Sequence, residues 1–362
     1  MTQQKGIIDP PVVVVGAGLA GSLLALALAR RGCRVEIVGA AGPSATALSY
    51  AGLPAAGIRA WRQLERCHGP LGLRPSRLVL HGWPGPLRHL PAPVQALPTA
   101  LLPFGRVDAP TLTEAMPRVL ERAGVARQET GVARIVPLQG GGWRLLDGNG
   151  GALAFSQDRK GIRHADAVSQ LVLAAGASCR ALWPALPERL RFSWAGVIEL
   201  DPAVLMAKGP AHPWLDQALR GRIVQPMRLR RPSLESAAAG LHEECWIVDA
   251  GLAPRDGGMV LGQITLVGPD PDPSRPPDPA VMEARLRSGL AELNPYLASL
   301  PGRYRQVPVT YCLQGPPLAE AVENAPGLWV FTGFSGAFAV VPSLAESLAE
   351  RLVAAVERHG GI

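Results

Sequence analysis

The chain has 362 residues, a hydrophobic fraction of 48% and a formal net charge of +7. This length is sufficient for two domains or one large domain, and this hydrophobic fraction excludes an intrinsically disordered protein. The arginines that carry the charge are scattered and the five cysteines and seven histidines show no metal-ligand spacing. The composition therefore argues against nucleic-acid binding and against a metal site, and it favours a reducing, cytoplasmic location.

The first predicted elements are a β-strand, a glycine-rich turn and an apolar helix. Residues 12–21 read VVVVGAGLAG, which has the spacing and context of a dinucleotide-binding turn. In such a turn the glycines allow a tight bend and a close approach of pyrophosphate, and the helix N-terminus faces the phosphates. The uncharged run 12–29 is therefore interpreted as a buried strand and helix rather than a membrane span. The predicted phosphate-binding residues are Gly16, Ala17, Gly18, Leu19, Ala20 and Gly21.

A second strand at residues 34–38 ends without the acidic residue that normally binds the adenosine ribose. Gly39 occupies that position, and Ala40 follows it. Glu36 lies two residues earlier, and the alternation of the strand places it on the solvent side. Two interpretations stay open: the ribose is held in another way, or the nucleotide site is weakened.

The middle of the chain mixes helices and strands. Residues 108–114 read DAPTLTE and predict a helix start with Thr111 and Glu114 as a capping box. Pro117 is expected to kink this helix. Other predicted elements are a helix at 58–67 and strands at 78–80, 131–137 and 143–146. His81 follows the first of these strands and is interpreted as structural rather than as a catalytic base.

The later part of the chain begins with LVLAAG at residues 171–176, which is typical of a buried parallel strand. An antiparallel sheet is predicted from the runs at 192–200, 223–230, 245–249 and 259–267. The chain then has a strand at 327–332, a tight turn at 333–336 and a helix opened by Pro342. This order predicts an α/β nucleotide-binding domain that is completed by the C-terminal segment, with a second domain inserted.

Four segments together resemble the D-amino-acid-oxidase-like FAD-dependent oxidoreductases, which include glycine oxidase and sarcosine oxidase. They are residues 12–38, 105–136, 165–177 and 327–352, which have the order of that family. The resemblance implies a Rossmann-like FAD-binding domain of the GR2/DAO type, with an inserted antiparallel-sheet substrate domain. The implied FAD-binding domain comprises residues 1–75, 105–190 and 325–362. The implied substrate domain comprises residues 76–104 and 191–324.

The resemblance also implies roles for residues outside the first turn. The main chain at Val132 would contact adenine, and Gly176 would let the chain pass close to the cofactor. The pyrimidine end of the flavin would lie near Gly333, Ser335, Gly336 and Ala337. Thr46 and Ser49 would line the cofactor loop, and Tyr50 would face the ring. The candidates for contact with substrate are Tyr50, Tyr311 and Gln314.

The chain departs from the family pattern in three places besides Gly39. The closing motif continues as Ala337-Phe338-Ala339, without the family's frequent histidine or lysine. Residues 309–322 contain no arginine to bind a substrate carboxylate, and the candidates to replace it are Arg228, Arg230 and Arg231. Cys312 lies in the region where some members attach flavin, but its spacing to Gly333 differs, so non-covalent FAD is expected.

The resulting expectation is an FAD-dependent enzyme that oxidises a C–N bond of a small amine or amino acid by hydride transfer to flavin. The electron acceptor is oxygen or an unknown compound. The alternative is a degenerate family member that acts as a nucleotide-binding or assembly protein without turnover. A flavin enzyme that acts on RNA and a nicotinamide dehydrogenase receive less support from the sequence.

Overall fold

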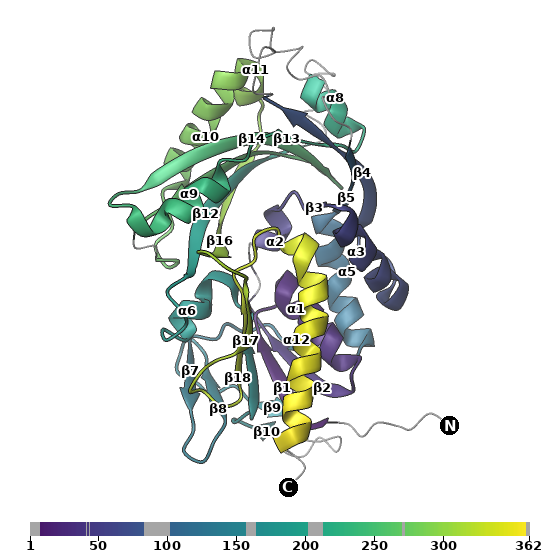
Figure 1. Ribbon diagram of the computed structural model, residues 1–362, viewed down its shortest axis with the longest axis vertical. Coiled ribbons are helices and arrows are strands. Elements are labelled where there is room, and N and C mark those ends of the chain that lie inside the picture. Colours follow the sequence, from purple (N-terminus) through teal and green to yellow (C-terminus); the bar gives the residue numbers. More distant parts are fainter. Residues whose placement is uncertain are drawn as a thin grey trace. The chain divides into compact units, whose positions relative to one another are not determined.

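The structure is a computed structural model that describes residues 8–40, 42, 44–82, 102–156, 164–201, 213–269 and 272–359 (Figure 1). The chain divides into two compact units. Unit 1 comprises the described residues of Met1–Gly42, Ala115–Arg191 and Thr310–Ile362. Unit 2 comprises those of Pro43–Glu114 and Phe192–Val309.

Unit 1 is built on a six-stranded sheet with the strand order β17-β18-β11-β1-β2-β6. The parallel strands are β18 (Leu328–Thr332), β11 (Gln170–Leu173), β1 (Ile8–Val15), β2 (Cys33–Val38) and β6 (Ala126–Gln128). The edge strand β17 (Leu318–Ala321) is antiparallel to β18. The carboxyl ends of the five parallel strands therefore share one edge of the sheet, which is where ligands bind in sheets of this kind.

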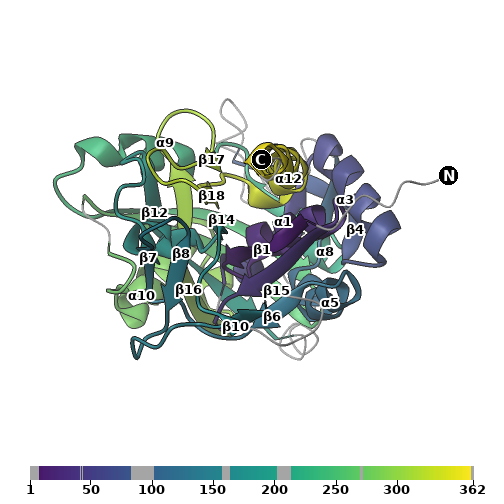
Figure 2. The same ribbon diagram turned by 90° about the horizontal axis from the view of Figure 1, so that it is seen from below.

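Helices and a hairpin cover this sheet. The helices α1 (Leu19–Ala29) and α12 (Ala337–His359) pack against each other, as Figures 1 and 2 show. Glu346 of α12 ties them together, because it lies 2.8 Å from Arg31 and 3.3 Å from Arg30. Core residues of β1 and β2 cluster with a hairpin formed by β7 (Arg134–Pro137) and β8 (Trp143–Leu146). The remaining short elements are β9 (Phe155–Ser156), β10 (His164–Ala165), a 3₁₀ turn (Gly176–Ser178) and α6 (Cys179–Leu182).

Unit 2 is built on an eight-stranded sheet with the order β16-β12-β15-β14-β13-β4-β5-β3 (Figure 1). In that order the strands are Arg303–Cys312, Leu190–Leu200, Gly258–Val267, Cys245–Arg255, Ile223–Pro226, Leu73–His81, Leu102–Val107 and Gly52–Leu53. The pairs β12–β15, β14–β15, β13–β14, β4–β5 and β3–β5 are antiparallel, whereas β13 and β4 are parallel. The four strands that were predicted to form an antiparallel sheet therefore do so, and the parallel pairing of β13 with β4 makes the complete sheet mixed.

The helices that begin in unit 2 are short except for three. They are α2 (Ala45–Leu48), α3 (Ala55–His68), α5 (Ala109–Arg122), α8 (Pro213–Leu219), α9 (Arg231–Ala237), α10 (Pro279–Leu293) and α11 (Pro295–Ala298), with a 3₁₀ turn at Ala238–Gly240. Helix α10 contacts β14 and β15. Gly289 allows this close approach, because a Cβ there would lie 2.7 Å from the Val248 side chain. Helix α5 continues from unit 2 into unit 1.

The extents of the two units differ from the expected domain boundaries. Residues 43–75 and 105–114 belong to unit 2, because β3, β4 and β5 pair within the eight-stranded sheet. Residues 310–324 belong to unit 1, because β17 pairs with β18. These boundaries depend on which strands pair with each other. The composition of the segments does not indicate that pairing.

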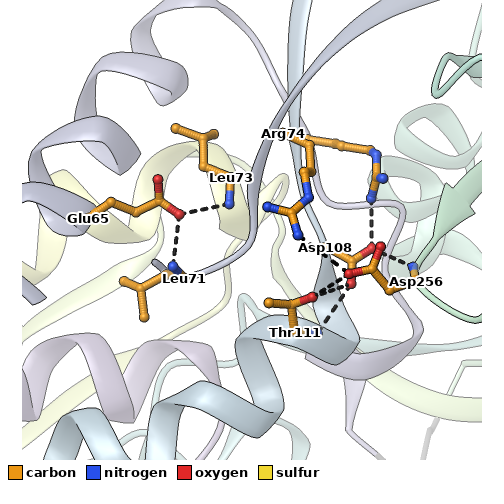
Figure 3. A network of polar contacts seen from close by, with 8 residues as sticks. Glu65, Leu71, Leu73, Arg74, Asp108, Thr111 and Asp256 are labelled. Atoms are coloured by element: carbon orange, nitrogen blue, oxygen red, sulfur yellow. Dashed lines mark hydrogen bonds and ion pairs between the residues drawn. The ribbon is translucent and has the colours of Figure 1, made fainter. Parts of the chain in front are cut away.

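Three local predictions were wrong. Asp108 rather than Thr111 caps α5, since its carboxylate accepts hydrogen bonds from the Thr111 N–H at 3.2 Å and the Thr111 hydroxyl at 2.8 Å (Figure 3). Helix α12 begins at Ala337 and contains Pro342 in its interior. Glu36 is only 6% exposed rather than on the solvent side, because β2 is an inner strand of a sheet that is covered on both faces.

Candidate functional site

The turn after β1 depends on glycine at two positions. Gly16 has a φ of +114°, and a Cβ there would lie 2.3 Å from the Ala174 carbonyl oxygen. A Cβ on Gly21 would lie 1.8 Å from the Gly16 carbonyl oxygen. The first glycine therefore lets the turn pack on the end of β11, and the last lets α1 pack on the turn.

The N-terminus of α1 is open to a ligand. Its N-cap residue is Gly18, no side chain caps the helix, and its first turn holds no acidic residue. Leu19 is buried, whereas Ala17 is exposed and Gly16, Gly18 and Ala20 are half-buried. A helix N-terminus with these properties attracts an anionic group through its backbone N–H groups and its dipole.

A second glycine turn connects β18 to α12. Gly333 has a φ of +83°, and a Cβ there would lie 2.4 Å from the Cys312 sulfur. Gly336 has a φ of +68°, Ser335 is exposed, and α12 begins at the next residue, Ala337. A hollow of about 400 Å³ adjoins the turn and is lined by Cys312, Gly315, Pro317, Gly333, Ser335, Ala339, Val340, Ser343 and Leu344.

Two further predicted cofactor residues also lie in unit 1. Gly176 begins the 3₁₀ turn that follows β11 and has a φ of +56°. Val132 is partly buried against the core cluster that contains Val38. Both turns and Gly176 follow the carboxyl ends of parallel strands, so unit 1 brings them to one edge of its sheet.

Thr46, Ser49 and Tyr50 belong to unit 2. Thr46 lies within α2, and the Ser49 hydroxyl accepts a hydrogen bond from the Ala51 N–H at 3.0 Å. The Tyr50 hydroxyl donates to the carbonyl oxygen of Gly262. Burial raises the pKa of Tyr50 far above its ordinary value, and the nearby Asp249 raises it further. These contacts support a positioning role for Tyr50 rather than proton transfer.

The two candidates in residues 309–322 have different surroundings. Tyr311 is 3% exposed, whereas Gln314 is exposed and has a φ of +49°. A left-handed conformation at a residue other than glycine is strained. The sequence did not indicate that Arg189 lies beside this segment, where its Nη1 donates to the Pro316 carbonyl oxygen at 2.5 Å. Because Arg189 is distant in sequence, only the fold reveals this placement.

Cys312 is half-buried beside Gly333. Burial raises the pKa of its thiol, while Arg189 acts in the opposite direction. The thiol form predominates at neutral pH, and it is a weaker nucleophile than the thiolate. This environment supports non-covalent FAD, which stays a prediction.

Two of the three arginines considered for a substrate carboxylate, Arg230 and Arg231, make local contacts. The Asp249 carboxylate accepts hydrogen bonds from the backbone N–H groups of Arg230 and Arg231 at 2.9 Å, and the Arg230 guanidinium donates to the Val248 carbonyl oxygen at 2.7 Å. The Arg231 side chain also lies 2.9 Å from Glu235. These contacts hold α9 against β14 and support a structural role for Arg230 and Arg231.

Gly39 has a steric reason to be glycine. A Cβ there would lie 2.8 Å from the Ala17 nitrogen and 2.9 Å from the Ala17 Cβ. The Gly39 N–H donates to the carbonyl oxygen of Gln128, the last residue of β6, at 3.1 Å. The position of the missing acid is therefore closed by the first glycine turn itself.

A strand, a glycine turn and a helix repeated at one edge of a parallel sheet define a dinucleotide-binding class of fold. The family model of FAD dependent oxidoreductases, DAO, matches residues 56–351. The chain therefore belongs to this family, and the predicted family and fold class are confirmed. No curated protein matches the sequence significantly.

Solved structures of similar fold are amine and amino-acid enzymes. Glycine oxidase from Geobacillus kaustophilus is 18% identical with a TM-score of 0.64 and 94% of each chain covered. Iminodiacetate oxidase from Chelativorans sp. BNC1 is 16% identical with a TM-score of 0.63 and 95% of each chain covered. L-amino acid deaminase from Proteus vulgaris is 18% identical with a TM-score of 0.55, over 98% of this chain and 92% of the other. At such identities the likeness concerns the fold.

The residues of unit 1 fit FAD, the cofactor of the family. Gly16 and Gly21 let β11, the turn and α1 pack closely, and α1 offers an uncapped N-terminus at the carboxyl edge of the sheet. Among the described residues, no group of three or more His, Cys, Asp or Glu side chains could hold a metal ion. No helix in the described ranges is long and apolar enough to cross a membrane.

Proposed function

We propose that this chain uses FAD to oxidise the C–N bond of a small amine or amino acid. The substrate would lose a hydride from carbon to the flavin and a proton from nitrogen to solvent, and it would leave as an imine, which water then hydrolyses. FAD, when bound, supplies the hydride acceptor, and oxygen or another compound takes the electrons afterwards. The family match supports the redox chemistry, and the activities of the structurally similar enzymes support the substrate class.

The observation that carries the proposal is the pair of glycine turns at the carboxyl edge of the six-stranded sheet. The Gly16 N–H donates to the Val38 carbonyl oxygen at 2.7 Å, so Gly16 would shape the turn, while Gly18, Gly21 and the free N–H groups at the N-terminus of α1 would hold the pyrophosphate. The turn at Gly333 and Gly336 would direct donors of α12 at the pyrimidine end of the flavin. Donors placed there stabilise the negative charge that develops on reduction.

Unit 2 would supply the substrate-binding surface. On one face of its sheet, Leu48, Tyr50, Leu80 and Phe104 pack around a buried apolar cluster. Gly251 lets β13 and the Tyr50 ring pack closely on β14, because a Cβ there would lie 2.6 Å from the Val224 carbonyl oxygen and 3.2 Å from the tyrosine ring. This apolar surface would orient an amine by shape, while the fixed Tyr50 ring limits its size.

The substrate class can be tested by anaerobic reduction. The FAD-loaded protein is mixed with a panel of primary and secondary amines and amino acids, and the loss of the visible flavin absorption is followed. Reduction by members of one class supports amine oxidation, and slower reduction by the α-deuterated substrate supports transfer of the α-hydrogen to the flavin. If the protein binds FAD readily but no amine or amino acid reduces it, this result contradicts the proposed amine oxidation.

The closing motif favours a second candidate function. It contains Ala337, Phe338 and Ala339 where the family often has histidine or lysine. A protein that binds FAD without turnover would explain this loss. The two candidate functions differ in the anaerobic experiment. Both predict a stable flavin spectrum before substrate is added, but only the enzyme predicts that a substrate bleaches it.

A further inference from the structure

The FAD-binding edge of unit 1 lacks an acceptor for the adenosine ribose at its usual place. That place is Gly39, whose missing side chain is enforced by the contact with Ala17. The adjacent strand β6 ends at Gln128, which is level with Val38, the last residue of β2. The hydrogen bond from the Gly39 N–H to the Gln128 carbonyl oxygen joins these two strand ends. Gln128 therefore places a polar side chain at the end of the neighbouring strand, beside Gly39.

The amide of Gln128 is fixed in orientation. Its Nε2 donates to the Glu36 carboxylate at 2.5 Å and to the Ala154 carbonyl oxygen at 2.7 Å. Both partners only accept hydrogen bonds, so the NH₂ group rather than the carbonyl oxygen must face them. Both hydrogens of the Gln128 amide are thus engaged. The Oε1 atom of this half-buried side chain is directed away from Glu36 and from the Ala154 carbonyl oxygen.

Glu36 is a buried carboxylate on the inner strand β2. It is 6% exposed, and a buried carboxylate is costly unless strong hydrogen bonds satisfy it. Its hydrogen bond to the Gln128 amide is of the charge-assisted kind, which is stronger than a bond between neutral groups. Glu36 therefore holds the Gln128 side chain in a single orientation.

We propose that Gln128 Oε1 accepts a hydrogen bond from a hydroxyl group of the adenosine ribose of FAD. It would replace the acidic residue that position 39 cannot accommodate, and Glu36 would act as its positioning residue. The inference rests on the proposed use of FAD and names the residue pair that completes that site. The ribose acceptor would thus have moved from β2 to β6 within the same sheet edge.

Substitution of Gln128 tests this assignment. Gln128→Leu keeps the approximate volume and removes the acceptor. Apoprotein is titrated with FAD, with an FAD analogue whose adenosine ribose lacks both hydroxyl groups, and with FMN, and binding is followed by flavin fluorescence. We expect Gln128→Leu to weaken FAD about fivefold, the worth of one neutral hydrogen bond. The dideoxy analogue and FMN should bind the variant and the parent equally.

Two further variants separate the roles. Glu36→Leu should reproduce the selective loss of FAD affinity, because the Gln128 amide is no longer held. Glu36→Gln should retain most of the affinity, since its amide oxygen still accepts from Gln128. Gln63→Leu on the exposed face of α3 serves as the matched control and should change none of the three affinities.

The outcomes distinguish this inference from the proposed function. If the parent protein fails to bind FAD, the proposed function fails. If the parent binds FAD but Gln128→Leu weakens FAD, dideoxy analogue and FMN by the same factor, or weakens none, the ribose assignment is wrong while the use of FAD stands.

Discussion

At the scale of single residues, glycine at position 39 is required for packing, in addition to lacking the carboxylate that would bind the ribose. The Ala17 nitrogen lies 2.8 Å from the position of a Cβ at residue 39, and a backbone atom cannot move aside cheaply. Glycine here and alanine in the turn therefore form a matched pair. The same contact explains why the acid of the family pattern could not remain.

Restoring the acid should consequently weaken FAD binding. In Gly39→Asp the new Cβ would displace the turn at Ala17, and overpacking of this size costs enough to weaken binding about tenfold. The dissociation constant of FAD measures the effect. Gly148→Asp is the control, because nothing lies within 4 Å of a Cβ there. Tighter binding by Gly39→Asp would contradict this explanation.

Residue-level predictions from the sequence were good where a motif is local and poor where a contact is not. The turn is predicted by a motif of only six residues, which contains Gly16, Gly18 and Gly21. Gln128 and Glu36 are 92 positions apart, and only the register between β2 and β6 brings them together. The prediction that Glu36 faces solvent was wrong. An alternating pattern places every second residue in solvent only when one face of the sheet is exposed, whereas parallel sheets are covered on both faces.

At the scale of elements, a buried polar network fixes the start of α5. Asp108 is fully buried and accepts hydrogen bonds from Thr111, from the Asp256 N–H at 2.8 Å and from Arg106 at 2.7 Å (Figure 3). Although burial raises the pKa of Asp108, the bonds from Arg106, Asp256 and Thr111 dominate and lower it below its ordinary value. One carboxylate thus joins β5, α5 and the β14–β15 turn.

Removing this carboxylate should destabilise the protein. Asp108→Ala removes the helix cap and leaves the buried Arg106 guanidinium without its counter-charge, so the free energy of unfolding should fall by about 3 kcal/mol. Urea denaturation measures the change. Asp166→Ala is the control, because its ion pair with Arg144 is well exposed and should contribute less than about 1 kcal/mol. Equal effects of the two substitutions would refute the role of Asp108.

His81, on the strand β4, should make stability depend on pH. Its ring stacks on Trp214 of α8 at 4.1 Å, its Nε2 lies 2.7 Å from the Ala250 carbonyl oxygen, and burial lowers its pKa to about 4. Between about pH 6.5 and pH 4 the unfolded chain binds a proton that the folded chain does not bind. Stability from this residue is therefore complete above about pH 6.5 and decreases as the pH falls.

The loss attributable to His81 should be roughly 2 kcal/mol between pH 7 and pH 5. Urea unfolding at the two pH values measures it, and His81→Phe, which keeps an aromatic ring against Trp214, should remove most of this difference. An unchanged pH dependence in His81→Phe would show that other groups cause it. The prediction that His81 is structural agrees with its buried contacts.

Element-level predictions succeeded where periodicity or a turn signal is strong and failed at boundaries. The final helix was expected to open at Pro342, which is favourable in a first turn, but it begins five residues earlier at Ala337. The Gly336 turn before it fixes that start. The sequence did not indicate the parallel pairing of β13 with β4, because these two strands are distant from each other along the chain.

At the scale of the whole molecule, the order of elements predicted an α/β protein in which a second segment interrupts a nucleotide-binding domain. The division into two discontinuous units and the family match agree with that class. The assignment of FAD binding to unit 1 and of substrate binding to unit 2 remains our proposal. It follows from the glycine turns in the first unit and the apolar sheet face in the second.

The central claim, that this chain holds non-covalent FAD at the carboxyl edge of its six-stranded sheet, is tested most directly by a visible absorption spectrum of the purified protein. The spectrum is recorded before and after denaturation and centrifugation. We expect flavin bands in the native protein that move to the supernatant after denaturation. We expect these bands to be lost in Gly21→Ala, where a Cβ would meet the Gly16 carbonyl oxygen at 1.8 Å. A folded, colourless protein that takes up no added FAD would contradict the account, and bands that stay with the pellet would contradict its non-covalent part.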